Sequence, residues 1–150
     1  MKKLGFCRLL LALVALIFSL SCGSITSPKP GLNIIASVSQ QTAQSVTFRI
    51  GVENTGTETK SLSFRNSQFF DIELRNGGGT LVWQYSHDAV FLDFVWGLEL
   101  APGESDVRDF TWNLTGNNGN AVPAGHYGAK VYITSSPREE GLIGNIKVSI

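Results

Sequence analysis

The chain has 150 residues, with 12 Lys or Arg and 12 Asp or Glu, so its formal net charge is zero. This length suits one domain, and the basic residues after the first eight positions are scattered singly, which argues against a nucleic-acid partner. The two cysteines, Cys7 and Cys22, both lie near the start. The rest of the chain therefore has no disulfide and must be stabilised by its core.

The first 22 residues form the most distinctive segment. A basic start is followed by an almost wholly apolar run over residues 9–20, and Ser21 precedes Cys22. An apolar run of about a dozen residues is shorter than the roughly 20 that span a bilayer, which is typical of a secretory signal. A small residue before cysteine resembles the lipobox of bacterial lipoproteins, although Ser19 stands where that motif usually has leucine. The alternative is an ordinary signal peptide in which Cys22 is incidental.

The lipobox resemblance implies three parts of the chain. Residues 1–21 are a lipoprotein signal peptide, residues 22–31 are the lipidated Cys22 with a flexible tether, and residues 32–150 are the folded domain. The tether contains two prolines and small polar residues, which cannot pack a core. Removing the signal takes away three basic residues, so the net charge becomes −3.

Alternation of apolar and polar residues with a period of two dominates the chain after the tether. Over residues 46–53, for example, apolar side chains occupy the even positions and mostly polar ones the odd positions, as in a half-buried antiparallel strand. Such runs predict strands at residues 32–38, 46–52, 70–74, 81–85, 110–114, 127–133 and 146–150. Clusters of Gly, Asn and Pro separate the runs, and no long segment has helical spacing. The pattern predicts an all-β, immunoglobulin-like antiparallel β-sandwich of seven to nine strands.

The alternation also assigns individual side chains to the two faces of these strands. Trp83 and Trp112 fall on the apolar faces and are expected in the core. Asp71 lies between Phe70 and Ile72 and is expected to face the polar side if they face inward.

Five short motifs between residue 46 and about residue 133 occur in a recognisable order. They are Val52-Glu53-Asn54-Thr55-Gly56, Phe70-Asp71-Ile72, Gly79-Thr80-Leu81-Val82-Trp83, Leu100-Ala101-Pro102-Gly103-Glu104-Ser105 and Pro123-Ala124-Gly125-His126-Tyr127. In this order and spacing they resemble the intracellular proteinase inhibitor (BsuPI) domain family. The resemblance implies a small β-sandwich that inhibits serine proteinases. This chain departs from the family pattern in two ways. It begins with an export signal, whereas the founding activity of the family is intracellular, and its residues 87–97 do not align with the family pattern.

Enzymatic and metal-binding functions find little support. Ser86, His87 and Asp88 are consecutive, so on a strand end they point alternately and do not converge as a catalytic triad must. His126 follows a turn, where a solvated or capping role is typical. Asn117, Asn118 and Asn120 could bind calcium through their carbonyls, but asparagines in a Gly-containing turn more often serve its backbone geometry. We predict no catalytic residue, no metal site and no cofactor.

Residues 87–97 break the alternation because apolar residues outnumber the inward positions. If Phe94 and Trp96 turn inward, Phe91 and Val95 have no place in the core. The segment is therefore either a doubly buried strand or capping loop, or an exposed apolar patch that marks a partner surface. The second hypothesis assigns binding to Phe91, Phe94, Val95 and Trp96.

Together these features predict a lipid-anchored, non-enzymatic domain of the cell envelope, on the periplasmic or extracellular face of a bacterial membrane. Its expected partners are the membrane, through the acylated N-terminus, and a serine proteinase or another envelope protein. The alternative is a structural or adhesive envelope module without inhibitory activity.

Overall fold

The computed structural model describes the backbone of residues 31–148 and the side chains of residues 31–139 and 141. This part of the chain forms strands and no helix, which confirms the all-β prediction. The strands are β1 (Leu32–Gln41), β2 (Val46–Asn54), β3 (Lys60–Phe64), β4 (Phe70–Asn76), β5 (Leu81–Gln84), β6 (Trp96–Leu100), β7 (Ser105–Trp112), β8 (Gly125–Ile133) and β9 (Glu139–Val148). The predicted signal peptide (1–21), Cys22 and nearly all of the tether lie outside the described residues. Within the described range, no helix is long and apolar enough to cross a membrane.

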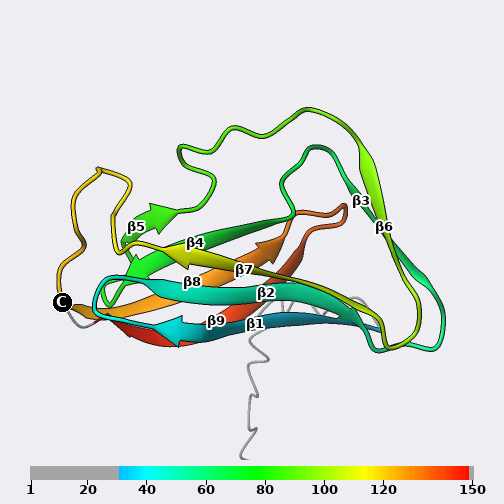
Figure 1. Ribbon diagram of the computed structural model, residues 1–150, viewed down its shortest axis with the longest axis horizontal. Helices are drawn as coiled ribbons and strands as arrows, with labels where there is room; N and C mark the ends of the chain where they lie inside the picture. Colours follow the sequence, from blue (N-terminus) through cyan, green and yellow to red (C-terminus); the bar gives the residue numbers. More distant parts are fainter. Residues whose placement is uncertain (1–30, 149–150) are drawn as a thin grey trace, which may run out of the picture.

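The strands form three antiparallel sheets. One has the order β1-β2-β7, the second β5-β4-β8-β9, and the third pairs β3 with β6. The two larger sheets share one core, and β3 and β6 stand at one end of them (Figure 1). Gly141 of β9 lies so close to β1 that an added Cβ would be 2.5 Å from Cγ2 of Ile34, so only glycine fits where these two strands meet.

The core follows the period-two alternation that the sequence shows. Val46, Phe48, Ile50 and Val52 of β2 are fully buried, whereas Arg49 is exposed. The second large sheet contributes Ile72, Leu74, Val131 and Ile133, and the small sheet contributes Leu62, Phe64 and Leu100. Burying such side chains stabilises a domain by roughly 1.5–3 kcal/mol each, before the entropy of ordering them is counted.

The two tryptophans expected in the core differ in their burial. Trp112 is 1% exposed, and its indole N–H donates to the Thr115 carbonyl at 2.8 Å. Trp83 is only half-buried because it lies on the short edge strand β5, where its ring is 5.7 Å from those of Phe110 and Trp112. The prediction is therefore confirmed for Trp112, and Trp83 lies at the rim of the core.

The observed elements depart from the predicted ones in several places. The last strand, β9, spans Glu139–Val148, whereas the alternation predicted only residues 146–150. The alternation did not predict β3 or β6, which pair only with each other. The predicted run 110–114 is not one strand, because β7 ends at Trp112 and Leu114 has a φ of 60°. This left-handed conformation is unusual for a non-glycine residue. The side chain of Leu114 is nevertheless buried, and its carbonyl accepts a hydrogen bond from the Val122 N–H at 2.9 Å.

A hydrogen bond from Asn54, which begins the Asn-Thr-Gly turn at the end of β2, links that strand to β6. Asn54 is fully buried, and its side-chain amide donates to the carbonyls of Glu58 and Leu100 at 2.8 Å each. Its side-chain oxygen accepts from the Gly56 N–H at 3.0 Å. These contacts fix the carboxyl-terminal end of β6, at Leu100.

Candidate functional site

The connection between β5 and β6, residues 85–95, carries the exposed apolar surface of the described chain. We call it the apolar loop; it arches over the upper side of the molecule in Figure 1. Val90 is 95% exposed, Leu92 70%, Phe94 48% and Val95 76%, and no other large hydrophobic side chain among the described residues is exposed. Contiguous exposed apolar surface is uncommon in monomeric proteins and often marks an interaction site.

The four residues predicted to bind lie in two environments. Phe94 and Val95 are exposed, whereas Phe91 and Trp96 are half-buried. The ring centroid of Phe91 is 5.9 Å from that of Tyr85. Trp96 is the first residue of β6 and turns inward, as the sequence allowed, while Phe94 does not.

Sequence reasoning missed Val90 and Leu92, which are the first and third most exposed large apolar side chains. The sequence of this segment did contain a sign that Val90 and Leu92 are exposed. Asp88 and Asp93 flank these residues, and aspartate is seldom buried unless it is paired.

The beginning of the apolar loop is fixed by Asp71 of β4. Its carboxylate accepts hydrogen bonds from the Ser86 hydroxyl at 2.8 Å, the Ser86 N–H at 3.2 Å and the Gln84 side-chain amide at 2.7 Å. Asp71 points away from the core residues Phe70 and Ile72, as expected, but it is only 4% exposed. The carboxylate is shielded from solvent because Gln84 and Ser86 cover it.

The middle of the apolar loop is held by Ser67, in the connection between β3 and β4. The Leu92 N–H donates to the Ser67 hydroxyl oxygen at 2.9 Å, and the Ser67 N–H donates to the Leu92 carbonyl at 2.9 Å. The backbone of Leu92 is therefore bound on both sides while its side chain extends into solvent. No described hydrogen bond reaches the backbone of residues 88–91 or 93–95, so two short arms remain available for a partner.

The end of the apolar loop is fixed by aromatic contacts. The Trp96 ring stacks on Phe64 with centroids 4.1 Å apart, and its indole N–H donates to the Asn66 carbonyl at 2.7 Å. The Arg108 guanidinium lies 3.9 Å from the Phe69 ring centroid and 5.7 Å from that of Trp96. Such stacking supports a defined position for the last residues of the loop.

The residues considered for catalysis do not form a triad in the described structure. The Ser86 hydroxyl donates to Asp71, and His87 contacts Asp88 instead, with Nε2 3.7 Å from Oδ1. His126 is exposed at the start of β8. Geometry of this kind does not activate a serine nucleophile.

The asparagines considered for calcium serve backbone geometry. The Asn117 side-chain oxygen accepts from the Gln84 N–H at 2.9 Å, and that of Asn118 accepts from the Asn120 N–H at 3.0 Å. Gly119 has a φ of 76°, which the turn requires. Among the described residues, no group of three or more His, Cys, Asp or Glu is placed to hold a metal ion.

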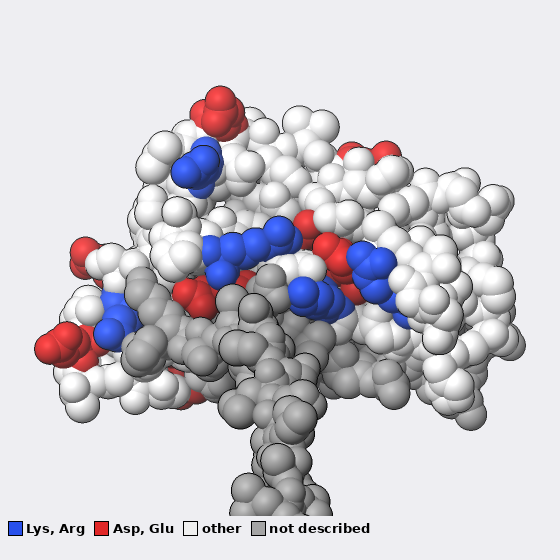
Figure 2. All heavy atoms as spheres, turned by 180° about the vertical axis from the view of Figure 1, so that it is seen from behind, with Lys and Arg blue, Asp and Glu red and all other residues white. Residues whose placement is uncertain are grey.

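Charged side chains of both signs mix in a band across the face seen in Figure 2. On β4, the Arg75 guanidinium donates to the Glu73 carboxylate at 2.9 Å. Partial burial alone would raise the pKa of Glu73, but hydrogen bonds with Arg75 and Tyr132 and the charges of Arg75 and Lys130 outweigh it and lower the pKa. Burial raises the pKa of the Tyr132 hydroxyl, with the Glu73 carboxylate adding to the effect.

The comparisons with known proteins give one family match. The family model described as BsuPI, intracellular proteinase inhibitor, matches residues 32–138, which contain all five sequence motifs. This match confirms the resemblance seen in the motifs. No curated protein matches the chain.

Similar solved structures are related only distantly. A β-glucosidase from Kluyveromyces marxianus is 17% identical, with a TM-score of 0.39, over 77% of this chain and 14% of that chain. β-Glucosidase 3B from Thermotoga neapolitana is 18% identical, with a TM-score of 0.37, over 77% of this chain and 16% of that chain. FlgD from Xanthomonas campestris is 20% identical, with a TM-score of 0.33, over 69% of this chain and 67% of FlgD. This chain thus spans a small part of the two glucosidases, and likeness at these TM-scores carries no argument about its function.

Proposed function

The chain belongs to the BsuPI family of intracellular proteinase inhibitors, and from that premise we propose that it inhibits a serine proteinase by docking the apolar loop into the enzyme's cleft. The observation that carries this proposal is the combination of exposure and restraint in residues 85–95. Val90, Leu92, Phe94 and Val95 are exposed on a loop that is held at its beginning, middle and end.

Restraint matters because ordering a loop on binding costs free energy, about 0.5–1.5 kcal/mol for each immobilised side chain. A loop that is already held loses less of this freedom when it docks. Large apolar side chains are also enriched at the centres of protein interfaces. We therefore expect the target proteinase to have a cleft that accepts Val, Leu or Phe side chains.

The same restraint supports resistance to cleavage. If the proteinase cut a peptide bond in the arm at residues 93–95, Leu92 would remain bound to Ser67 and Trp96 would remain stacked on Phe64. The new ends would stay close together, and a high effective concentration of the two ends favours resealing over release. The chain acts in this proposal as a binding protein and not as an enzyme.

The shape of the domain fits this role if the fold is immunoglobulin-like. The three-stranded and four-stranded antiparallel sheets with a shared core support that finer assignment. The apolar loop then presents its arms from a rigid scaffold, as binding loops on such sandwiches do.

We also propose that the protein is exported and anchored at the outer side of a bacterial membrane through acylated Cys22. The support is the signal-like sequence of residues 1–21. Each acyl methylene buried in a bilayer contributes about 0.8 kcal/mol, so several chains hold a protein firmly. A Cys22→Ser variant is expected to lose labelling by a palmitate analogue and to leave the membrane fraction. Unchanged labelling would contradict the anchor.

The inhibitory activity is tested by titrating the purified mature chain into a panel of serine proteinases of differing specificity. We expect inhibition of at least one enzyme that prefers apolar residues, saturating at one inhibitor per enzyme. A panel without any inhibition would contradict the proposal and favour the alternative, a structural or adhesive module of the cell envelope.

A further inference from the structure

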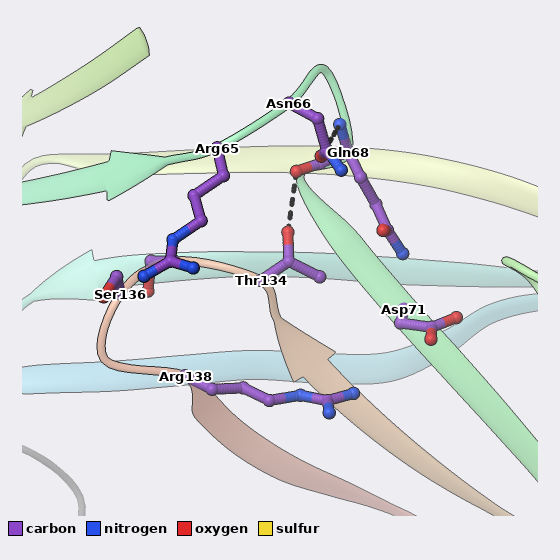
Figure 3. A pocket seen from close by; sticks show the side chains of 8 residues that line it. Arg65, Asn66, Gln68, Asp71, Thr134, Ser136 and Arg138 are labelled. Atoms are coloured by element: carbon purple, nitrogen blue, oxygen red, sulfur yellow. Dashed lines mark hydrogen bonds between the residues drawn. The ribbon is translucent and has the colours of Figure 1, made fainter. Parts of the chain in front are cut away.

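A second feature of the molecule lies apart from the exposed side of the apolar loop. It is a hollow of about 470 Å³ between the β3–β4 connection, the strand β4 and the β8–β9 connection (Figure 3). Arg65 and Asn66 come from the first of these segments, and Ser136 and Arg138 come from the last. The volume lies in the range of small-molecule sites, about 300–1,000 Å³.

The arginines of this hollow differ from the other arginines of the described chain. The three arginines elsewhere each have a carboxylate partner, in the pairs Arg49–Asp109 at 3.7 Å, Arg75–Glu73 at 2.9 Å and Arg108–Asp106 at 3.4 Å. Arg65 and Arg138 have no carboxylate within 4.0 Å among the described side chains, and both line the same hollow. Two unpaired guanidinium groups in one concave site create a local excess of positive charge.

Arg138 is also held in place by its neighbour. Its guanidinium carbon is 3.6 Å from the centroid of the Tyr132 ring. A guanidinium over an aromatic ring keeps its N–H groups directed outward from its edge, where they are free to donate. The arginine is therefore oriented before any ligand arrives.

Several hydrogen-bond acceptors in the hollow already receive hydrogen bonds from the protein itself. The two oxygens of Asp71 receive four hydrogen bonds, from the Ile72 N–H at 2.9 Å and from Gln84 and Ser86 as described above. A carboxylate has about four lone-pair positions, so Asp71 has none left for the arginines. The Gln68 carbonyl accepts from the Thr134 hydroxyl at 2.6 Å, a contact drawn in Figure 3.

Two further groups in the hollow are free to donate a hydrogen bond. The Asn66 side-chain oxygen accepts from the Gln68 N–H at 3.0 Å, which leaves the Asn66 amide nitrogen without a described partner. The Ser136 hydroxyl likewise has no described partner, although its backbone N–H donates to the Ser63 carbonyl at 2.9 Å. With Arg65 and Arg138, these groups form a donor-rich site in which the one carboxylate, that of Asp71, is already fully hydrogen-bonded.

The geometry points to a binding site for the carboxylate or phosphate group of a small organic anion, held by Arg65 and Arg138. Guanidinium groups make strong, charge-assisted hydrogen bonds to both kinds of oxyanion. This assignment does not depend on proteinase inhibition, since it rests on different residues. The two sites adjoin, however, because Ser67, which contacts Leu92, lies in the chain between Asn66 and Gln68, two residues that line the hollow.

The test is calorimetric titration of the mature chain with inorganic phosphate and, separately, with citrate. Saturable binding of either anion is expected, and the tighter of the two identifies the group as phosphate or carboxylate. Loss of a charge-assisted contact should weaken binding about tenfold or more in Arg65→Gln and in Arg138→Gln. Arg49→Gln is the matched control, because Arg49 is an exposed arginine on β2 outside the hollow.

Two results would overturn the assignment. The first is the absence of saturable binding of both anions. The second is an equal loss in Arg49→Gln, which would show a diffuse charge effect. Arg65 is exposed on a connection and makes no described contact that folding needs, so its variant remains informative even if Arg138→Gln fails to fold. An Arg138→Lys variant adds a check, because it keeps the charge but loses the planar contact with Tyr132; we expect its affinity to lie between those of the wild type and Arg138→Gln.

Discussion

Strand β2 and the apolar loop contain the same kinds of side chain in opposite environments. Val46 and Phe48 of β2 are fully buried, whereas Val90 and Phe94 of the loop are 95% and 48% exposed. β2 lies between β1 and β7, so its backbone is paired on both sides and its alternate side chains face the second sheet. The loop has no strand partner and is held by contacts at Ser86, Leu92 and Trp96.

The comparison shows that apolar composition alone does not determine burial. In a strand, pairing with neighbouring strands determines which side chains face the core. In a loop held by only a few contacts, no such pairing turns the apolar side chains inward, so they can remain in solvent. Exposed apolar residues favour aggregation unless a partner covers them. Folding therefore explains the apolar residues of β2, whereas those of the loop form the surface that we propose binds a partner.

The largest expected effect on stability is at a buried core residue. Trp112→Ala should reduce the free energy of unfolding by about 3–5 kcal/mol, because the side chain is buried and a cavity remains. Trp83→Ala should cost clearly less, since Trp83 is half-buried on the edge strand β5. Denaturant unfolding of both variants measures the difference. Equal losses would contradict the position of Trp83 at the rim.

A smaller effect on stability is expected where the loop is held. Ser67→Ala removes the acceptor for the Leu92 N–H, and a net hydrogen bond contributes about 0.5–1.5 kcal/mol. The loop should become more mobile, so limited proteolysis should cut within residues 87–95 faster than in the wild type. Ser61→Ala, at an exposed serine of β3, is the control. Unchanged cleavage in Ser67→Ala would mean that this contact does not restrain the loop.

The ion pair on the charged outer face of β4 should contribute less than about 1 kcal/mol to the free energy of unfolding, as is typical of ion pairs near a surface. The folded state lowers the pKa of Glu73, so its ionised carboxylate stabilises the protein above the pKa of the unfolded chain. This contribution is lost as the pH falls through the folded-state pKa. Glu73→Gln should therefore be less stable than the wild type near neutral pH and equally stable in strong acid. Unfolding curves at both pH values test this, and a difference that grows in acid would contradict it.

The smallest effect on stability is expected at the exposed valines. Val90→Ser combined with Val95→Ser should change the free energy of unfolding by about 0.5 kcal/mol or less, because both side chains are in solvent. The same change at buried Val46 should be strongly destabilising. The double variant should nevertheless lose proteinase inhibition. Phe91 is a poorer choice for this test, because its ring packs against Tyr85.

The sequence predicted the parts of the fold where alternation is long. β2, β4 and β8 each carry three or more inward residues in succession, and their burial follows the pattern. β3 was missed because only Leu62 and Phe64 alternate in its five residues. β6 was missed because its alternation begins at Trp96, within an apolar run that hides it.

The candidate site was predicted only in its approximate place. The excess of apolar residues at 87–97 marked the segment, but which of them are exposed depends on contacts distant in sequence. Ser67 holds Leu92 from 25 positions away, and Asp71 holds Ser86 from 15. The sequence also gave no signal for the hollow, because Arg65 and Arg138 come together only through the folding of β4 and β8.

The central claim, that the apolar loop is the surface that contacts a proteinase, is tested most directly by hydrogen–deuterium exchange. The mature chain is compared alone and in complex with the proteinase that it inhibits most strongly. We predict that backbone amides of residues 88–91 and 93–95, which have no described hydrogen-bond partner in the free chain, become protected in the complex. Protection confined to other segments, with exchange in these two arms unchanged, would contradict the claim.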